Sequence, residues 1–69
     1  MITFTGYVAR GNMPDMTKLS DLRNLAKWLD ESWDEAKRDA EAWGLEGHDA
    51  QVVKLRITIE EEEEQAPPA

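Results

Sequence analysis

The stretch "LSDLRNLAKWLDESWDEAKRDAEAW" occupies residues 19–43 and decides the fold of this chain. Its apolar residues recur three or four positions apart: Leu19, Leu22, Ala26, Leu29, Trp33, Ala36, Ala40 and Trp43. That spacing places them on one face of an α-helix. It predicts a single helix over residues 18–43, about 39 Å long at 1.5 Å per residue. We expect Gly44 to end this helix in the left-handed conformation, with Leu45 packing back on the last turn.

Two segments with alternating apolar and polar residues flank the helix and predict strands over residues 2–9 and 51–60. One face of the strands would carry Ile2, Phe4, Val8, Val53, Leu55, Ile57 and Ile59. The other would carry Thr3, Thr5, Tyr7, Lys54, Arg56 and Thr58. Gly6 is expected to mark a bulge or a close approach of another segment.

The predicted fold is α+β, a strand–long helix–strand (βαβ) unit in which residues 1–59 form a single domain. A crossover of this kind makes the two strands parallel. A two-stranded sheet is marginally stable, and strands of eight to ten residues span only about 26–33 Å, less than the helix. We therefore expect a homodimer or higher homo-oligomer, with a four-stranded sheet and two helices on one face. The competing geometry is a helix-to-helix oligomer seam of Leu19, Leu22, Leu29, Trp33 and Trp43.

The charge of the chain is uneven. The formal net charge is −7, and the run Glu60–Glu64 supplies five of the negative charges. Residues 60–69 are predicted to form an acidic, proline-containing disordered tail, because like charges and prolines cannot bury enough apolar surface to offset their ordering entropy. There is no cysteine, no secretory signal pattern and no apolar run of about 20 residues. These features favour a cytoplasmic protein that does not span a membrane.

Catalytic and cofactor signals are nearly absent from the sequence. Ser20 and Ser32 have no histidine placed beside them, and the neighbours His48 and Asp49 are too few for a metal site. The carboxylate pairs Asp30/Asp34 and Glu31/Glu35 are interpreted as a solvated helix face, because exposed carboxylates keep ordinary pKa values. The prediction is a protein without catalytic residues, cofactor or metal.

Two surfaces are predicted to bind partners. Trp28 lies about 115° from the centre of the apolar helix face at 100° per residue. Its ring folds over Leu25, covers a neighbouring subunit in the dimer, or anchors a partner protein, since exposed Trp is enriched at binding hot spots. Tyr7, Lys54 and Arg56 would lie together on the outer sheet face. Such a face is typical of β-sheet readers of nucleic acid, and equally of solvated sheets that resist aggregation. The acidity of the chain argues against nucleic acid.

The fragment "GYVARGNMPDMTKLSDLRNLAKWL", residues 6–29, is similar to an antitoxin fold in which a strand bearing Tyr-Val leads through a proline-containing loop into a helix. The resemblance implies a nucleic-acid-binding regulator. The chain lacks that family's extra hairpin and its predicted helix is longer, so no site residue is carried over. In length, tryptophan content and acidity the chain resembles small accessory products of bacteriophages. The function predicted is a non-enzymatic protein-binding or regulatory module that acts as a homo-oligomer and modulates a host factor. A nucleic-acid-binding regulator is the alternative.

Overall fold

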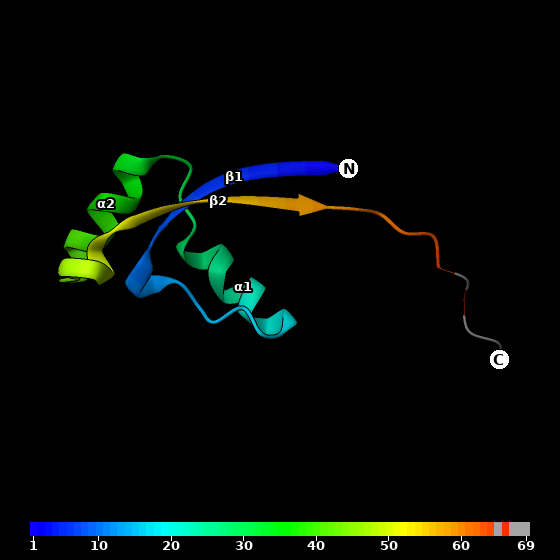
Figure 1. Ribbon diagram of the computed structural model, residues 1–69, viewed down its shortest axis with the longest axis horizontal. Coiled ribbons are helices and arrows are strands. Elements are labelled where there is room, and N and C mark those ends of the chain that lie inside the picture. Colours follow the sequence, from blue (N-terminus) through cyan, green and yellow to red (C-terminus); the bar gives the residue numbers. More distant parts are fainter. Residues whose placement is uncertain (65, 67–69) are drawn as a thin grey trace.

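A computed structural model describes residues 1–64 and 66 of the chain (Figure 1). The order of elements is β1, α1, α2 and β2, with short 3₁₀ turns after β1 and before β2. The bounds are Ile2–Ala9 for β1, Leu19–Trp28 for α1, Trp33–Ala42 for α2 and Val52–Ile59 for β2. The 3₁₀ turns cover Arg10–Asn12 and Gly47–Ala50. The fold is therefore α+β, with two strands and two helices among the described residues.

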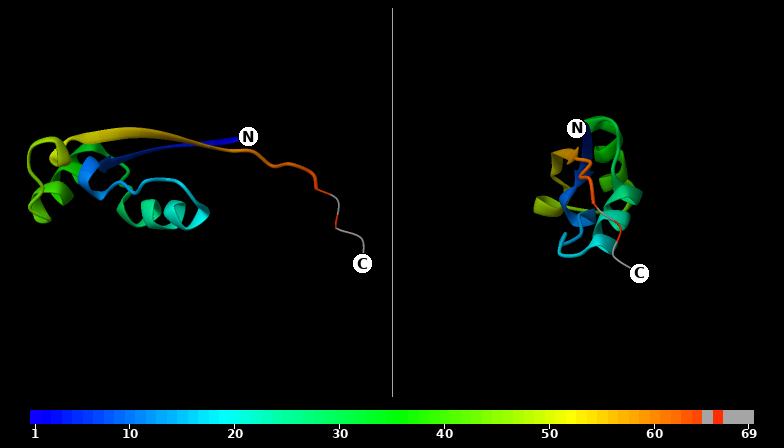
Figure 2. Two further views of the ribbon diagram at one scale, coloured as in Figure 1. Left: turned by 60° about the horizontal axis from the view of Figure 1, so that its bottom comes forward. Right: turned by 90° about the vertical axis from the view of Figure 1, so that its right-hand side faces the viewer.

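The two strands pair antiparallel, so the predicted parallel βαβ crossover is wrong. Pairing is one-to-one from Ile2 opposite Ile59 to Ala9 opposite Val52. After β1 the chain runs back beneath the sheet, and α1 then returns it to the end where β1 stops (Figures 1 and 2). Strand β2 consequently begins beside the end of β1, which makes the pair antiparallel.

The single helix over residues 18–43 is also wrong, because the chain leaves the helical conformation between α1 and α2. Leu29 adopts an extended conformation with φ −76° and ψ 125°. The amide of Asp30 donates to the carbonyl oxygen of Tyr7 at 2.8 Å, and the amide of Tyr7 donates to the carbonyl oxygen of Asp30 at 2.8 Å. The break thus gives the free edge of β1 a short third partner, which satisfies groups that an edge strand otherwise leaves open.

Helix α2 has its own start and stop signals. The Ser32 Oγ accepts a hydrogen bond from the amide of Glu35 at 3.3 Å, as an N-cap side chain does. At the other end Gly44 has φ +68°, and the amide of Leu45 donates to the carbonyl oxygen of Ala40 at 2.9 Å. This is the Schellman arrangement that the sequence predicts at Gly44.

The start of α1 is organised by Asp21. Its Oδ2 accepts hydrogen bonds from the amides of Thr17 at 2.9 Å and Lys18 at 3.2 Å. The hydrogen bond from the Thr17 amide is the main cause that lowers the pKa of Asp21, since it favours the charged carboxylate. The carboxylate in the first turn therefore reaches back to satisfy amides that the helix cannot pair.

The core is small and lies at one end of the sheet. The buried apolar side chains are Val8, Ala9, Leu25, Ala36 and Ala40. Helix α2 presents its two buried alanines, which allow the helix backbone to approach β1 closely. An unbroken helix of about 39 Å would outrun an eight-residue strand of about 26 Å. Breaking it lets both halves pack within the length of the sheet.

The predicted assignment of residues to the two sheet faces is correct, although the strands are antiparallel rather than parallel. Phe4 pairs with Ile57 and Val8 with Val53, while Thr5 pairs with Arg56 and Tyr7 with Lys54. Opposite residues in a pair point to the same face, so the apolar and polar sets stay together as predicted. The described tail residues 60–64 are exposed and lack regular secondary structure, whereas the prediction for residues 65 and 67–69 lies outside the described residues.

Candidate functional site

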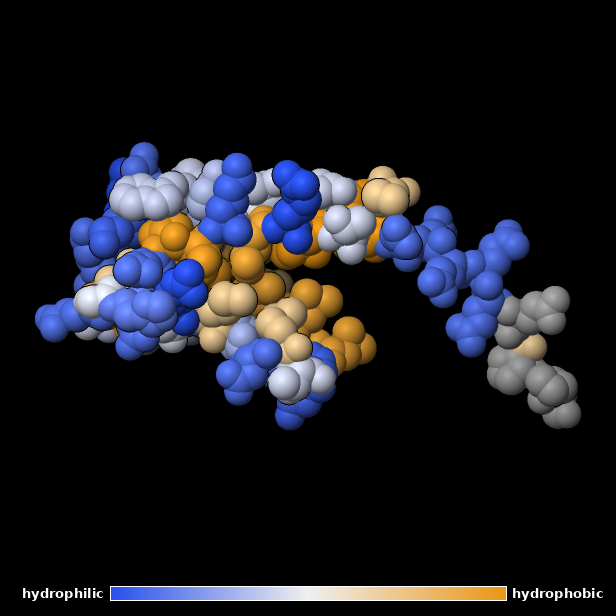
Figure 3. All heavy atoms as spheres, in the orientation of Figure 1, coloured by the Kyte–Doolittle hydropathy of each residue, from blue (hydrophilic) through white to orange (hydrophobic). Residues whose placement is uncertain are grey.

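An open apolar groove separates α1 from the half of the sheet that projects beyond the core. Its volume is ≈ 580 Å³. The apolar lining side chains come from both walls: Phe4, Ile57 and Ile59 from the strands, and Leu22, Leu25, Ala26 and Leu29 from α1 and the residue after it. Figure 3 shows hydrophobic side chains on both sides of the gap between the sheet and α1. The volume falls within the range of small-molecule and peptide sites.

The walls of the groove are unusually exposed for side chains on the inner face of a sheet. Phe4 is 54% exposed and Ile59 is 51% exposed, and across the groove Leu22 is 42% exposed. Only Leu25, at 3%, is covered as core residues normally are. Contiguous exposed apolar surface of this kind is typical of interaction sites and ligand-binding grooves.

The titratable groups that line the groove are both acidic. Asp30 and Glu31 lie at its closed end, where the chain leaves α1, and no lysine, arginine or histidine belongs to the described lining. Burial is the largest cause that raises the pKa of the Asp30 carboxyl to about 6, followed by the neighbouring carboxyl of Asp39 and then Glu35. The Asp30 Oδ2 is shielded from solvent and has no hydrogen-bond partner among the described residues.

The predicted oligomer seam does not form one continuous stripe, because the helix that would carry it is broken. Leu22 and Leu29 line the groove, and Leu19 is 79% exposed at the start of α1. Trp33 and Trp43 lie on the far helix, one as the first residue of α2 and the other as its C-cap. The predicted seam residues therefore divide into one group at α1 and the residue after it, and another at the two ends of α2.

Trp28 packs within the chain against another aromatic ring, and its predicted role at a contact with a partner stays a prediction. The ring of Trp28 meets that of Trp43 edge to face, with centroids 5.2 Å apart and an interplanar angle of 77°. Trp28 is half-buried, and Trp43 is exposed. Leu25 is part of the core and of the groove floor. The aromatic pair ties α1 to the end of α2 and lies outside the groove lining.

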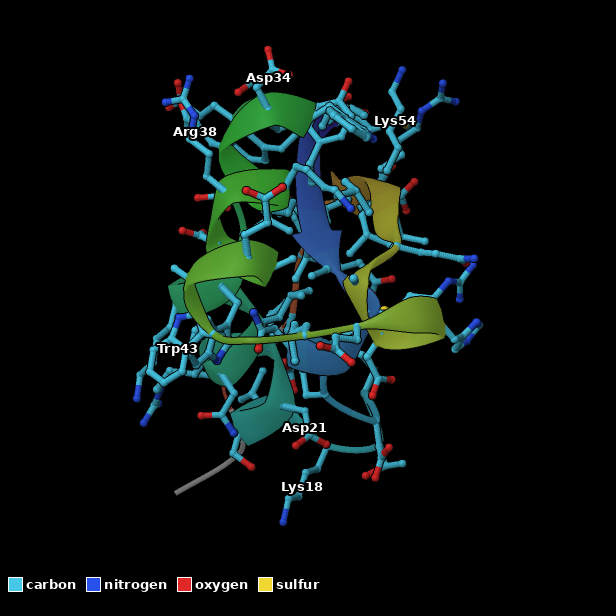
Figure 4. The ribbon with its side chains drawn as sticks, turned by 90° about the vertical axis from the view of Figure 1, so that its left-hand side faces the viewer. Lys18, Asp21, Asp34, Arg38, Trp43 and Lys54 are labelled. Atoms are coloured by element: carbon cyan, nitrogen blue, oxygen red, sulfur yellow. The ribbon has the colours of Figure 1, made fainter. Side chains whose placement is uncertain are left out.

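The outer sheet face carries Tyr7, Lys54 and Arg56 as predicted, with Tyr7 opposite Lys54. Lys54 and Arg56 are exposed, and Figure 4 shows Lys54 projecting into solvent away from Lys18 and Asp21 at the start of α1. Asp34 and Arg38 project from α2 in the same view (Figure 4). Nucleic-acid binding by the outer face stays a prediction.

The remaining candidate residues are dispersed. His48 and Asp49 are exposed in the 3₁₀ turn before β2, and neither belongs to the groove lining. Among the described residues, no group of three histidine, aspartate or glutamate side chains is placed to hold a metal ion. No helix in the described part of the chain has the length and apolarity needed to cross a membrane.

Two features of the site escaped the sequence analysis. The sequence identifies the apolar sheet face but assigns it wholly to the core, because alternation does not tell how far a helix covers it. Asp30 is interpreted as a solvated carboxylate, since its burial depends on the break between α1 and α2. The signal for that break is present in the sequence: Ser32 and Glu35 form the S-x-x-E pattern of a helix start. Comparisons of the chain with models of protein families, with curated proteins and with solved structures find no match.

Proposed function

We propose that this chain is a small non-enzymatic protein-binding module that acts as a homodimer, with the β2 wall of the apolar groove at the contact between the copies and the rest of the groove available to a partner polypeptide. The observation that carries the proposal is the exposure of Phe4 and Ile59 on the face of the sheet that packs against helices elsewhere. Apolar side chains that remain half exposed in the protomer gain most when another polypeptide covers them.

The chemistry of the groove supports binding rather than catalysis. Thr5, Thr58, Asp30 and Glu31 are its polar lining residues, and the rest of the lining is apolar or glycine. A nucleophile needs a base within hydrogen-bonding reach, and these four residues supply no histidine or lysine for that role.

The small core supports self-association. Among the described residues five apolar side chains are buried, and the sequence of 69 residues contains no cysteine. A domain of this size buries a limited fraction of its surface and generally needs disulfides, a metal or a partner chain. A second copy of the same chain is the simplest such partner, because symmetric homodimers are the most common oligomers of soluble proteins.

The test is the oligomeric state of a matched pair of variants. Ile59→Asp introduces a charge on the β2 wall of the groove, whereas Thr3→Asp introduces the same charge on the outward face of β1. Light scattering should find the wild type and Thr3→Asp dimeric at micromolar concentration and Ile59→Asp largely monomeric. A wild-type chain that is folded and monomeric under these conditions contradicts the homodimer, and equal behaviour of the two variants contradicts the use of the groove.

The alternative, a nucleic-acid-binding regulator, has one observation in its favour. Lys54 and Arg56 are exposed on one sheet face beside Tyr7. A filter-binding titration at low salt, where electrostatic attraction is strongest, tests it with wild type and a Lys54→Ala/Arg56→Ala variant. Retention of nucleic acid by wild type alone would favour this alternative over the groove.

A further inference from the structure

The outer edge of β2 has no strand partner in the described part of the chain. Strand β2 pairs with β1 on one side, and the two-stranded sheet ends there. The opposite side of β1 is occupied in part by Asp30. The helices lie beneath the sheet toward β1, so the outer edge of β2 stays open (Figure 2). An open strand edge is a template for a further strand.

Charges of opposite sign follow one another along β2 and the residues after it. Lys54 and Arg56 are exposed on the outer face, and Glu60–Glu64 follow the end of the strand directly. Side chains alternate between faces along an extended chain, so Glu60 and Glu62 would continue the face of Lys54 and Arg56. Glu61 and Glu63 would continue the opposite face.

These charges discriminate among the ways in which two copies of β2 can pair. If the helices of both copies lie on the same side of the joined sheet, the two-fold axis is perpendicular to the sheet. One residue of β2 then lies directly opposite the same residue of the other copy, and this residue defines the position of the axis. An axis at Leu55 sets Lys54 opposite the partner's Arg56, and an axis at Arg56 sets two arginines opposite each other. Like charges directly opposite each other destabilise a sheet.

An axis at Ile57 removes both conflicts. Lys54 then lies opposite the partner's Glu60, which pairs opposite charges twice in the symmetric dimer. On the inner face Ile57 meets its own copy and Leu55 meets the partner's Ile59, so apolar residues face apolar residues. Moving the axis on to Thr58 keeps the charge pairing but leaves Leu55 opposite the partner's Glu61.

We propose that two copies of the chain join through the outer edges of β2, antiparallel and centred on Ile57, and that the acidic run sets this register by placing Glu60 opposite Lys54 of the other copy. The proposal rests on the homodimer put forward above and adds its geometry. The result is a four-stranded sheet in the order β1, β2, β2, β1, with both grooves opening on the same side. The acidic segment then determines the strand register at the interface.

Charge reversal tests the pairing, with a matched control in the neighbouring residue. Lys54→Glu and Glu60→Lys should each raise the dimer dissociation constant about tenfold, because each affects two symmetry-related pairs. Combining them restores opposite charges and should bring the constant back to within about threefold of wild type. Glu61→Lys makes the same charge change on the other face and should have a much smaller effect. Sedimentation equilibrium measures the dissociation constants of the wild type and the four variants.

Cross-linking of variants with one introduced cysteine locates the two-fold axis, because the natural chain contains no cysteine. Residues directly opposite in an antiparallel pair have Cα atoms about 4.5–5.5 Å apart, within reach of a disulfide, whereas diagonal neighbours lie about 7–8 Å apart. Under mild oxidation Ile57→Cys should therefore cross-link into a covalent dimer, and Arg56→Cys, Thr58→Cys and Thr3→Cys should not.

Distinct results overturn the two proposals. Three results contradict the register while leaving the homodimer intact. They are equal effects of Glu60→Lys and Glu61→Lys, a double variant that dimerises as weakly as the single variants, and cross-linking that is most efficient at a position other than 57. A wild-type monomer contradicts both proposals.

Discussion

The side chain of Leu29 packs directly on the backbone of Gly6. A Cβ atom at Gly6 would lie 2.5 Å from the Leu29 Cγ and 2.7 Å from one of its Cδ atoms. Leu29 is the first residue after α1, and Gly6 is in the middle of β1. This contact and the adjacent main-chain pairing of Tyr7 with Asp30 hold the break between the helices against the edge of β1. Gly6 therefore allows the close approach of another segment, which is one of the two roles that the sequence predicts for it. The other predicted role, a bulge, does not occur, because β1 and β2 pair one-to-one.

Gly6→Ala should destabilise the fold by about 1–3 kcal/mol, the usual cost of forcing an extra methyl group into a packed contact. The cause is the collision with Leu29, since the backbone at Gly6 does not have the positive φ that strains alanine. Urea unfolding followed by circular dichroism measures the change. In a Leu29→Ala background the same substitution should cost little, because the colliding atoms are gone. An equal cost in both backgrounds would mean that the close approach is not responsible.

Asp30→Asn should stabilise the protein at neutral pH. The folded-state pKa of Asp30 is raised from 3.8 to about 6, so the folded state holds a proton that the unfolded state releases. Stability therefore falls as the pH rises from about 4 to 6, and the full penalty remains above that range. Because Asp30 is only partly buried, solvent screening reduces the penalty, and we expect a gain on the order of 1 kcal/mol. Asparagine is neutral at every pH and avoids the penalty.

The pH dependence of unfolding checks this prediction. The groups that face Asp30 are Asp39 and Glu35 of α2, both acidic, so replacing them is not a neutral control. Asp34→Asn makes the same change at an exposed position of α2 and should leave the difference in stability between pH 4 and pH 7 unchanged. If Asp30→Asn lowers stability at pH 7, the charge of Asp30 is compensated and the argument from burial fails.

Ser32→Ala should destabilise α2 by about 1 kcal/mol, because the amide of Glu35 loses the oxygen that caps it. Hydrogen exchange should become faster at the first amides of α2 before it does in the strands. Ser20→Ala is the control, since Ser20 lies within the first turn of α1 and none of the side-chain hydrogen bonds in the described part of the chain involves it. It should change stability little. A similar loss in both variants would contradict the capping role.

Trp28 and Trp43 should show an energetic coupling of about 0.5–1.5 kcal/mol in a double-mutant cycle with leucine. Their edge-to-face contact joins α1 to the C-terminal end of α2, so each substitution alone should weaken the packing of the two helices. Unfolding monitored by circular dichroism avoids reliance on tryptophan fluorescence. Replacing Trp33, the exposed first residue of α2, should not couple to Trp28. Additive losses at Trp28 and Trp43 would show that the contact contributes nothing.

Local patterns in the sequence predict much of the secondary structure. Alternation locates both strands and sorts Phe4 and Ile57 to one face, Tyr7 and Lys54 to the other, whichever way the strands run. Gly44 marks the end of the second helix because glycine adopts positive φ readily. The error lies at residues 29–32, where a regular apolar spacing outweighed the S-x-x-E start signal at Ser32.

The direction of β2, the burial of Asp30 and the existence of the groove depend on tertiary structure alone. An apolar period of 3.6 continues through a short break, so the spacing itself does not reveal one. What favours the break is the main-chain edge of β1 at Tyr7 and the space above Gly6, both distant in sequence from Leu29. Side-chain periodicity reports which face of an element is apolar; only the path of the chain determines how much of that face is covered.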